Sequence, residues 1–396
     1  MVALVVIVML AIAGCGTEST AAEQDPPVDL NALDVGGYQH EPMDFAPKSR
    51  PFVSRVFEAE RLGAYVPLAS EIDPGLKVNR ADSVHAFLGP DEAHPSPMYA
   101  WLKKDGFGDD AKGFIAGFAT KGESSDDYTI SYSVATSVLL FDSDRSASTA
   151  ATALAARGWS SVSGDIQVEP VRSAAHPEAI SSWRPDAQVL ASWYATGRFV
   201  IVALAESMDN RTLKISDRSQ LQSLTDRAIT VTSERIKTFQ PTAPDRIGDS
   251  PLDPDGLLRI SLRRPDGDSF TNMPGVYSSA AFLHLDDHPA TTKPQFDRYG
   301  VDRIAVDAMR LYRTRDAQAA KQFVAEIAIE KFTRRTGSPT GLPTAQCREY
   351  HGPEHLTYPF YCYVAFGRYV AMNWGSQLSE VHQRISAQYS ILARSK

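Results

Sequence analysis

The sequence lacks the features by which proteins usually bind nucleic acid or cross a membrane. Lys and Arg total 40 against 48 Asp and Glu, the net charge is −8, and no basic cluster is interleaved with aromatics. Nucleic acid is therefore not expected as a partner, because a basic surface is what holds its phosphates. The apolar run at residues 2–13 is about twelve residues long, whereas a membrane-spanning helix needs about 20.

Motifs of catalysis are missing as well. The chain has no G-x-S-x-G, no Walker loop and no G-x-G-x-x-G, so we expect neither nucleotide-dependent chemistry nor a cofactor. Residues 248–250 and 267–270 begin with Gly-Asp-Ser, as one class of esterases does. That class also needs a downstream Asp-x-x-His, and the chain offers only residues 379–382, Ser-Glu-Val-His. We expect no catalytic residue, and a hydrolase of cell-wall lipid or glycan esters is the alternative.

Cysteine is scarce, and the first of the three cysteines lies directly after the apolar run. The small residues of Ile12-Ala13-Gly14 precede Cys15, which predicts a signal peptide over residues 1–14 with cleavage before the cysteine. The arrangement resembles the lipobox of bacterial lipoproteins. We expect Cys15 to carry lipid and to anchor the protein to the outer face of the cytoplasmic membrane. A buried helix followed by a chance cysteine is the alternative.

The other two cysteines, Cys347 and Cys362, form an even pair. In an oxidising extracytoplasmic compartment such a pair tends to bridge, so we predict a disulfide between them. It would close a loop of about 15 residues and stabilise the fold by about 3 kcal/mol. Two unpaired buried thiols are the alternative.

Composition along the chain predicts two folded domains. Residues 15–48 are polar and lack apolar periodicity, which favours a lipidated N-terminus followed by a flexible tether. Residues 241–255 are rich in proline and aspartate and predict a linker. The first domain then covers residues 49–240 and the second covers residues 256–396, as the chain length also suggests.

The two predicted domains repeat one pattern. An apolar strand at residues 134–141 leads into a helix at about residues 144–157, and residues 305–312 lead into a helix at about residues 316–331. Each half ends with an amphipathic helix. Chance recurrence is the alternative to duplication.

A Gly-Arg pair inside a β-rich segment also recurs, at Gly197-Arg198 and again at Gly367-Arg368. Strands flanking a helix, followed by a terminal helix, predict α+β domains. We expect two similar domains, each with a mainly antiparallel sheet and its helices packed on one face.

Several segments together resemble a known group of proteins. They are the lipobox, residues 64–68 (Ala-Tyr-Val-Pro-Leu), residues 71–74, residues 113–118, the Gly-Arg strands and the paired cysteines. The chain looks like two-domain exported lipoproteins of unknown function from mycolic-acid-containing actinobacteria. The resemblance implies a cell-envelope location and a two-domain architecture, and it supplies no activity.

Two histidine clusters could bind a metal. Residues 351–355, His-Gly-Pro-Glu-His, match the H-x-x-E-H pattern of inverted zincins, but that chemistry needs a helix and the proline disfavours one. Residues 284–288 place two histidines and two aspartates together, and we interpret them as the end of a strand that enters a solvated turn. We predict no metal site.

Tyrosines crowd the predicted disulfide, namely Tyr350, Tyr358, Tyr361 and Tyr363. Alternation along residues 360–366 puts Cys362 on one face and Tyr361 with Tyr363 on the other. The tyrosine face is a candidate binding surface, and packing beneath a helix is the alternative. We predict a non-catalytic binding module for an envelope lipid, glycan or protein.

Overall fold

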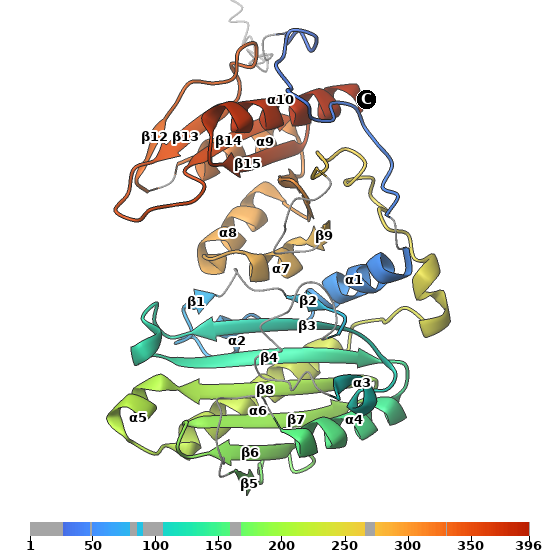
Figure 1. Cartoon of the computed structure of the whole chain (residues 1–396), viewed down its shortest axis with the longest axis vertical. Helices are drawn as coiled ribbons and strands as arrows, with labels where there is room; N and C mark the ends of the chain where they lie inside the picture. Colours follow the sequence, from blue (N-terminus) through green and yellow to red (C-terminus); the bar gives the residue numbers. More distant parts are fainter. Residues whose placement is uncertain are drawn as a thin grey trace, which may run out of the picture.

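The computed structural model describes residues 27–47, 50–79, 85–89, 106–158, 168–265, 274–329 and 331–395. Within these ranges the chain forms two antiparallel sheets, one above the other in Figure 1. The first domain contains, in chain order, α1 (Arg50–Gly63), α2 (Ala69–Ile72), β1 (Val78–Asn79), β2 (Ala86–Phe87), α3 (Phe107–Asp110), β3 (Phe114–Glu123), η2 (Tyr128–Ile130), β4 (Tyr132–Phe141), α4 (Asp144–Arg157), β5 (Glu169–Val171), β6 (Ile180–Arg184), β7 (Val189–Thr196), β8 (Phe199–Ser207), α5 (Met208–Leu213) and α6 (Arg218–Ile236).

A short 3₁₀ helix, η3 (Pro244–Asp249), lies in the connection between the domains. The second domain contains, in chain order, β9 (Gly275–Ser278), α7 (Ser279–Phe282), η4 (Leu283–Leu285), α8 (Pro289–Tyr299), β10 (Arg303–Val306), β11 (Arg310–Arg313), α9 (Ala317–Ile327), β12 (Thr333–Arg335), β13 (Gln346–Tyr350), β14 (Phe360–Phe366), β15 (Tyr369–Gly375) and α10 (Leu378–Arg394).

The strand order is the same in the two sheets. The first sheet runs β1-β3-β4-β8-β7-β6-β5, and the second, taken from its β9 end, runs β9-β10-β11-β15-β14-β13-β12. In each sheet the strand before a long helix, β4 or β11, pairs with the second strand of a hairpin, β8 or β15. That helix is capped at its N-terminus by Ser143 in α4 and by Asp316 in α9. The predicted α+β class with two similar, mainly antiparallel domains is confirmed.

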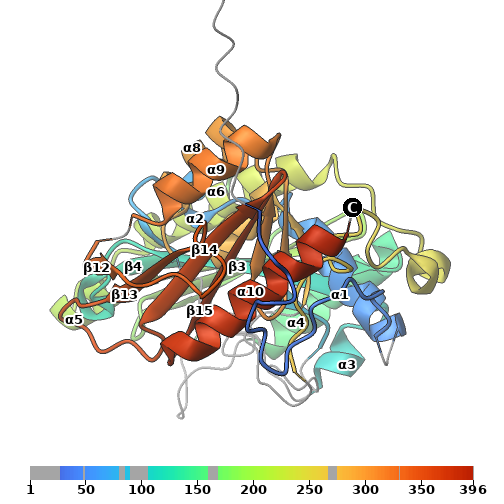
Figure 2. The ribbon, with the colours of Figure 1, turned by 90° about the horizontal axis from the view of Figure 1, so that it is seen from above.

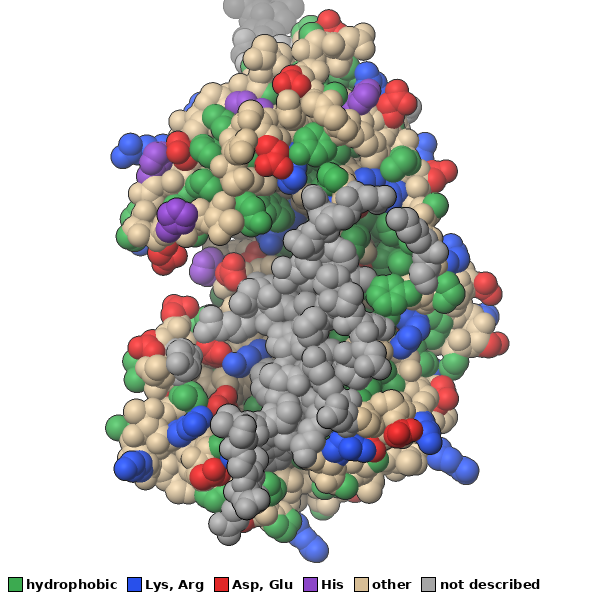
Figure 3. All heavy atoms as spheres, in the orientation of Figure 1, with side chains coloured by type: hydrophobic (Ala, Val, Ile, Leu, Met, Phe, Trp, Pro, Cys, Tyr) green, Lys and Arg blue, Asp and Glu red, His purple; other side chains and the backbone are tan. Residues whose placement is uncertain are grey.

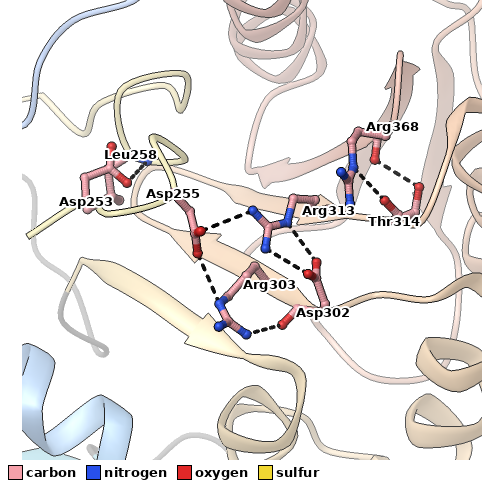
Figure 4. Close-up of polar contacts among 8 residues, drawn as sticks. All are labelled: Asp253, Asp255, Leu258, Asp302, Arg303, Arg313, Thr314 and Arg368. Carbon is pink, nitrogen blue, oxygen red and sulfur yellow. Dashed lines mark hydrogen bonds and ion pairs between the residues drawn. The ribbon is translucent and has the colours of Figure 1, made fainter.

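The recurring arginine occupies the same structural position in both domains. The Nε of Arg198 donates to the carbonyl of Phe141 at 2.8 Å, and the Phe141 N–H donates back to the Arg198 carbonyl at 2.8 Å. Arg368 makes the same pair of bonds with Thr314, both at 2.9 Å (Figure 4). Each arginine therefore ties the hairpin turn to the end of the neighbouring strand.

Helices cover both faces of each sheet, whereas we expected them on one face. In the first domain α4 packs on the face of Leu139, while α6 packs on the opposite face with Val138. In the second domain α9 covers the face of Tyr312 and α10 covers the face of Leu311. The central strands are apolar at successive positions, and successive side chains point to opposite faces. Both faces therefore need a helix.

The two domains are joined through α1 and a set of buried polar contacts. Helix α1 lies between the first sheet and β9, and one hydrophobic core includes residues of both domains. Asn79 donates to the carbonyls of His284 at 3.0 Å and of Asp286 at 2.7 Å. In α1 the fully buried Glu60 faces Tyr277, and desolvation raises the pKa of its carboxyl well above the usual range. The interface is a packed core rather than a hinge.

The predicted tether is attached to the second domain over much of its length. Residues 15–26 lie outside the described residues, but residues 27–40 run beside α10 (Figure 2), and Phe45 reaches Phe57 of α1. The hydroxyl of Tyr38 donates to Glu380 at 3.3 Å and accepts from the Nε of Arg384 at 3.1 Å. Apolar side chains such as Leu33 join the core, which is why this segment is ordered.

The predicted linker is also held in place by charged groups (Figure 4). Asp255 accepts from the Nε of Arg303 at 3.2 Å and lies 3.5 Å from Arg313. Arg313 in turn makes two bonds of 2.8 Å with Asp302. Asp253 accepts from the N–H of Leu258 at 3.0 Å. Asp255 therefore pairs with arginines at the ends of β10 and β11, while Asp253 binds backbone N–H groups of the following turn.

Candidate functional site

The predicted disulfide is present and lies inside the second domain. Cys347 of β13 and Cys362 of β14 are directly opposite each other in the antiparallel ladder, and they are bonded. Both are fully buried against α10, on the face that the alternation predicted. The bond fixes the long β13–β14 connection at its base.

Two of the four predicted surface tyrosines lie beneath a helix instead. Tyr363 is 1% exposed, and Tyr361 is partly buried against the same hydrophobic cluster. Helix α9, which supplies Phe323 to this cluster, covers their face of β14. The prediction that Tyr361 and Tyr363 form an exposed binding surface is therefore wrong, and the alternative, packing beneath a helix, is correct.

The other two predicted tyrosines, Tyr350 and Tyr358, remain accessible. Phe332, which was not predicted from the sequence, is also exposed and contacts Tyr350. Tyr358 is 51% exposed and Phe332 is 50% exposed, while Tyr350 is partly buried. The rings of Phe332 and Tyr350 meet edge to face with centroids 6.4 Å apart. Tyr358 lies in the adjoining loop, next to Pro359, whose carbonyl accepts from the Tyr350 N–H at 2.8 Å. We call Phe332, Tyr350 and Tyr358 the aromatic cluster.

Phe332 has an unusual backbone for a bulky residue. Its φ is +62°, in the left-handed region, where an L side chain costs about 1–3 kcal/mol. The Phe332 carbonyl accepts from the His351 N–H at 2.8 Å, and Thr333 pairs with Tyr350 across the ladder. These bonds hold the strained residue with its ring in solvent. Backbone strain combined with an exposed aromatic ring is typical of a functional position.

An arginine–aromatic contact lies at the far end of the face that α9 covers. The guanidinium of Arg310 lies 5.1 Å from the ring of Phe282 and 5.3 Å from that of Trp374. Burial alone would lower the pKa of Arg310, but Tyr312 together with Asp286 raises it. The contact keeps a charged side chain inside the second domain and links α7 to β15.

The residues around His284 do not form the strand and solvated turn that we expected. Residues 279–285 are helical, and His284 is buried between the domains. Its Nε2 bonds the Val66 carbonyl at 3.1 Å and its Nδ1 bonds the Thr120 hydroxyl at 3.0 Å. Burial and then the neighbouring His85 lower the pKa of His284 to about 3, so the ring is neutral. His288 is exposed, so the two histidines do not converge.

The H-x-x-E-H segment is a loop, as its proline predicted. Residues 351–355 contain no helix, and His351 is paired with Glu349 at 3.2 Å. Within the described residues, the ligand atoms of Cys347, Cys362 and His382 lie close enough to hold a metal, but both sulfurs belong to the disulfide. Of the Gly-Asp-Ser segments, residues 267–270 lie outside the described part of the chain, as does Cys15 with the signal peptide.

Together these features define a two-domain α+β protein in which one antiparallel unit occurs twice. The chain belongs to the DUF7373 family: residues 46–252 match its N-terminal domain and residues 257–395 its C-terminal domain, both described as domains of unknown function. No curated protein matches the chain. No helix among the described residues is long and apolar enough to cross a membrane.

One solved structure shows a limited similarity. The extracellular domain of PknH from Mycobacterium tuberculosis matches 49% of this chain and 99% of its own length, with 12% sequence identity and a TM-score of 0.28.

Proposed function

We propose that the protein is an exported cell-envelope lipoprotein that binds an envelope component without catalysis, through the aromatic cluster. The anchoring part rests on the sequence: an apolar run, a small-residue cleavage site and Cys15 in the position that lipoprotein processing requires. The anchor would hold the protein at the outer face of the cytoplasmic membrane.

The observation that supports binding is the exposed, strained Phe332 beside Tyr350 and Tyr358. Aromatic side chains provide large contact areas at low conformational cost, and a contact held in place before the partner arrives reduces the entropy lost on binding. The Cys347–Cys362 bond at the base of the connection serves that preorganisation.

The test of anchoring is metabolic labelling with a radioactive fatty acid in cells that express the full chain. We expect label on the wild type and none on Cys15→Ala. Label on the variant would contradict lipid attachment at this residue.

The test of binding is a pull-down from envelope extracts with residues 16–396, which are the mature chain without the lipid-bearing Cys15. We expect a specific component to be captured by the wild type and lost with Phe332→Ser plus Tyr358→Ser. Exposed Met43→Ser is the matched control. A different result would contradict the proposal that the protein is not an enzyme: turnover of an ester, peptide or glycoside substrate, lost when one Ser, His or Glu is replaced.

A further inference from the structure

Exposed apolar side chains are concentrated in two loop regions, here called the two loops: η2 with the α5 segment in the first domain, and the α9–β12 connection with the β13–β14 connection in the second. Of the nine large apolar side chains that are exposed within the described ranges, six belong to these loops, and the remaining three are Met43, Val168 and Ile180. The first domain contributes Ile130 (59%), Leu213 (66%) and Ile215 (49%), and the second contributes Ile329 (72%), Phe332 (50%) and Tyr358 (51%). We call these six residues the docking face.

The two loops lie on the same side of the molecule. Helix α5, which carries Leu213, and strands β12 and β13, which adjoin Phe332 and Tyr358, are all at the left edge in two perpendicular views (Figures 1 and 2). Along the left edge of both domains in Figure 3, hydrophobic side chains occur together with basic and acidic ones. A single broad partner could therefore contact both loops at once.

Local structure holds the first loop in shape. The Thr212 hydroxyl donates to the Thr129 carbonyl at 3.4 Å, which ties α5 to η2, and the Ile215 N–H donates to the Asn210 carbonyl at 2.8 Å. Lys214 has φ +53°, so each loop contains a non-glycine residue with left-handed backbone. Two of the three such residues in the described chain therefore lie in these loops, where they turn apolar neighbours outward.

The second-domain group is flanked by cations in a chain of net charge −8, since exposed Lys331, Arg334 and Arg335 adjoin Phe332. Exposed Arg211, Lys214 and Arg218 lie near the first-domain group, where the carboxylates of Asp126, Asp127, Asp209 and Asp217 also lie. The Lys331 ammonium lies 4.7 Å from the centre of the Phe332 ring. Apolar side chains next to cations are the pattern by which a protein lies in the interface of an anionic membrane.

We infer that the docking face rests on an anionic lipid bilayer, with both domains in contact. The apolar side chains would enter the boundary between headgroups and acyl chains, and the cations would face lipid phosphates. Isoleucine and leucine offer a sugar neither a stacking surface nor a hydrogen bond, which favours lipid over glycan. This inference rests on the proposed function, since it names the partner of the aromatic cluster and adds the first-domain loop to the same contact.

The test is sedimentation of residues 16–396, which lack the lipid-bearing Cys15, with vesicles of roughly one-third phosphatidylglycerol in phosphatidylcholine. We expect binding to these vesicles, little binding to pure phosphatidylcholine, and weakening by salt. Leu213→Ser with Ile215→Ser, and separately Ile329→Ser with Phe332→Ser, should each lower the partition coefficient about tenfold. The matched control, Met43→Ser with Val168→Ser, also removes two exposed apolar side chains and should bind as the wild type does.

Two further variants separate insertion from charge attraction and from misfolding. Phe332→Trp should be quenched by brominated lipid more strongly than the wild type, which reports contact of this position with acyl chains. Arg334→Glu with Arg335→Glu should weaken binding, while Arg334→Lys with Arg335→Lys should retain it. Thermal midpoints equal to that of the wild type would show that these surface variants are folded.

The outcomes distinguish this inference from the proposed function. Absence of binding to anionic vesicles, or equal binding by wild type and both serine pairs, would overturn the membrane contact. If the pull-down still captures a protein or glycan through Phe332 and Tyr358, the proposed function stands and only the membrane contact is wrong. If that capture also fails, both are wrong.

Discussion

The two domains share one strand order but differ in the size of the side chains that the covering helix supplies. In the first domain the sheet supplies large side chains, such as Trp193, and α4 packs against them with alanines, such as Ala150. In the second domain α9 supplies Phe323 at the equivalent helical position, and its ring meets those of Phe296 and Tyr312. Both sheets therefore contribute large side chains, and only the second helix does.

This difference teaches that the property shared by the two domains is backbone geometry rather than side-chain identity. The guanidinium groups of Arg198 and Arg368 each bond a backbone carbonyl of the neighbouring strand, so this contact tolerates Phe141 in one domain and Thr314 in the other. Cores can accept extensive substitution if the total volume is kept. The two halves share the bonds that orient their hairpins although the bonded residues differ.

Exchanging the large and small helical residues tests the comparison most strongly. Phe323→Ala removes a ring that is 1% exposed from an aromatic cluster, and we expect a loss of about 3–5 kcal/mol in the free energy of unfolding. Ala150→Phe overfills the first domain and should cost about 1–3 kcal/mol. Chemical denaturation followed by circular dichroism measures both. A loss below about 1 kcal/mol for Phe323→Ala would show that α9 does not depend on this ring.

The disulfide is found in the second domain and has no counterpart in the first, so its removal should affect the halves unequally. Cys347→Ser with Cys362→Ser should cost about 3 kcal/mol through the entropy of the unfolded chain. Amide hydrogen exchange should rise around β13 and the loop of His351 and His355, while β4 and β8 keep their protection. Equal loss of protection in both sheets would contradict local stabilisation of the second domain.

The contact between the domains should be sensitive to acid through His284. Its pKa is about 3 in the folded protein against an ordinary 6.5, so it binds fewer protons when folded than when unfolded. The stability it contributes is complete above pH 6.5 and is lost as the pH falls towards 3. At pH 5 the loss should be about 2 kcal/mol.

The matched variant for this prediction is His284→Gln, which keeps a hydrogen-bonding side chain and has no titration in this range. Thermal unfolding from pH 7 to pH 5 should show a smaller decline for His284→Gln than for the wild type. Parallel declines would mean that His284 does not carry the acid sensitivity.

The smallest expected loss of stability should be the same in both domains. Gly197 and Gly367 have φ of +54° and +55° at the two equivalent hairpin turns. Alanine at either position should cost about 1 kcal/mol, because its Cβ disfavours the left-handed region. Asparagine tolerates this region better and is the control. Unequal costs in the thermal midpoints of the two alanine variants would argue that the turns are not equivalent.

Local patterns in the sequence predicted the strands, the repeat and the disulfide. Apolar runs and β-branched residues are typical of strands wherever the neighbours are, and glycine marks the turn that joins two strands of a hairpin. Cys347 and Cys362 are close in sequence and lie on adjacent strands of one meander. Such features depend on short stretches of chain.

Features set by distant elements could not be predicted in this way. The burial of Tyr363 depends on α9, and that of His284 depends on Thr120 in the other domain, a separation of 164 residues. Alternation along β14 correctly assigned the side chains of this strand to the two faces of the sheet. It did not show that a helix would cover the face of Tyr361 and Tyr363. Phe332 had a signal, since it is a lone aromatic residue in the basic stretch Lys331 to Arg335, but its backbone conformation cannot be derived from that pattern.

The packing of residues 27–40 beside α10 joins the start of the described residues to this helix. Tyr38 and Arg384 are 346 residues apart, so their contact closes a loop that includes nearly the whole protein. During synthesis the earlier segment leaves the ribosome first and has no binding surface until the final helix follows. Contacts of such long range are slow to form because the loop entropy must be lost first. The N-terminal segment therefore forms these contacts only after α10 has been synthesised.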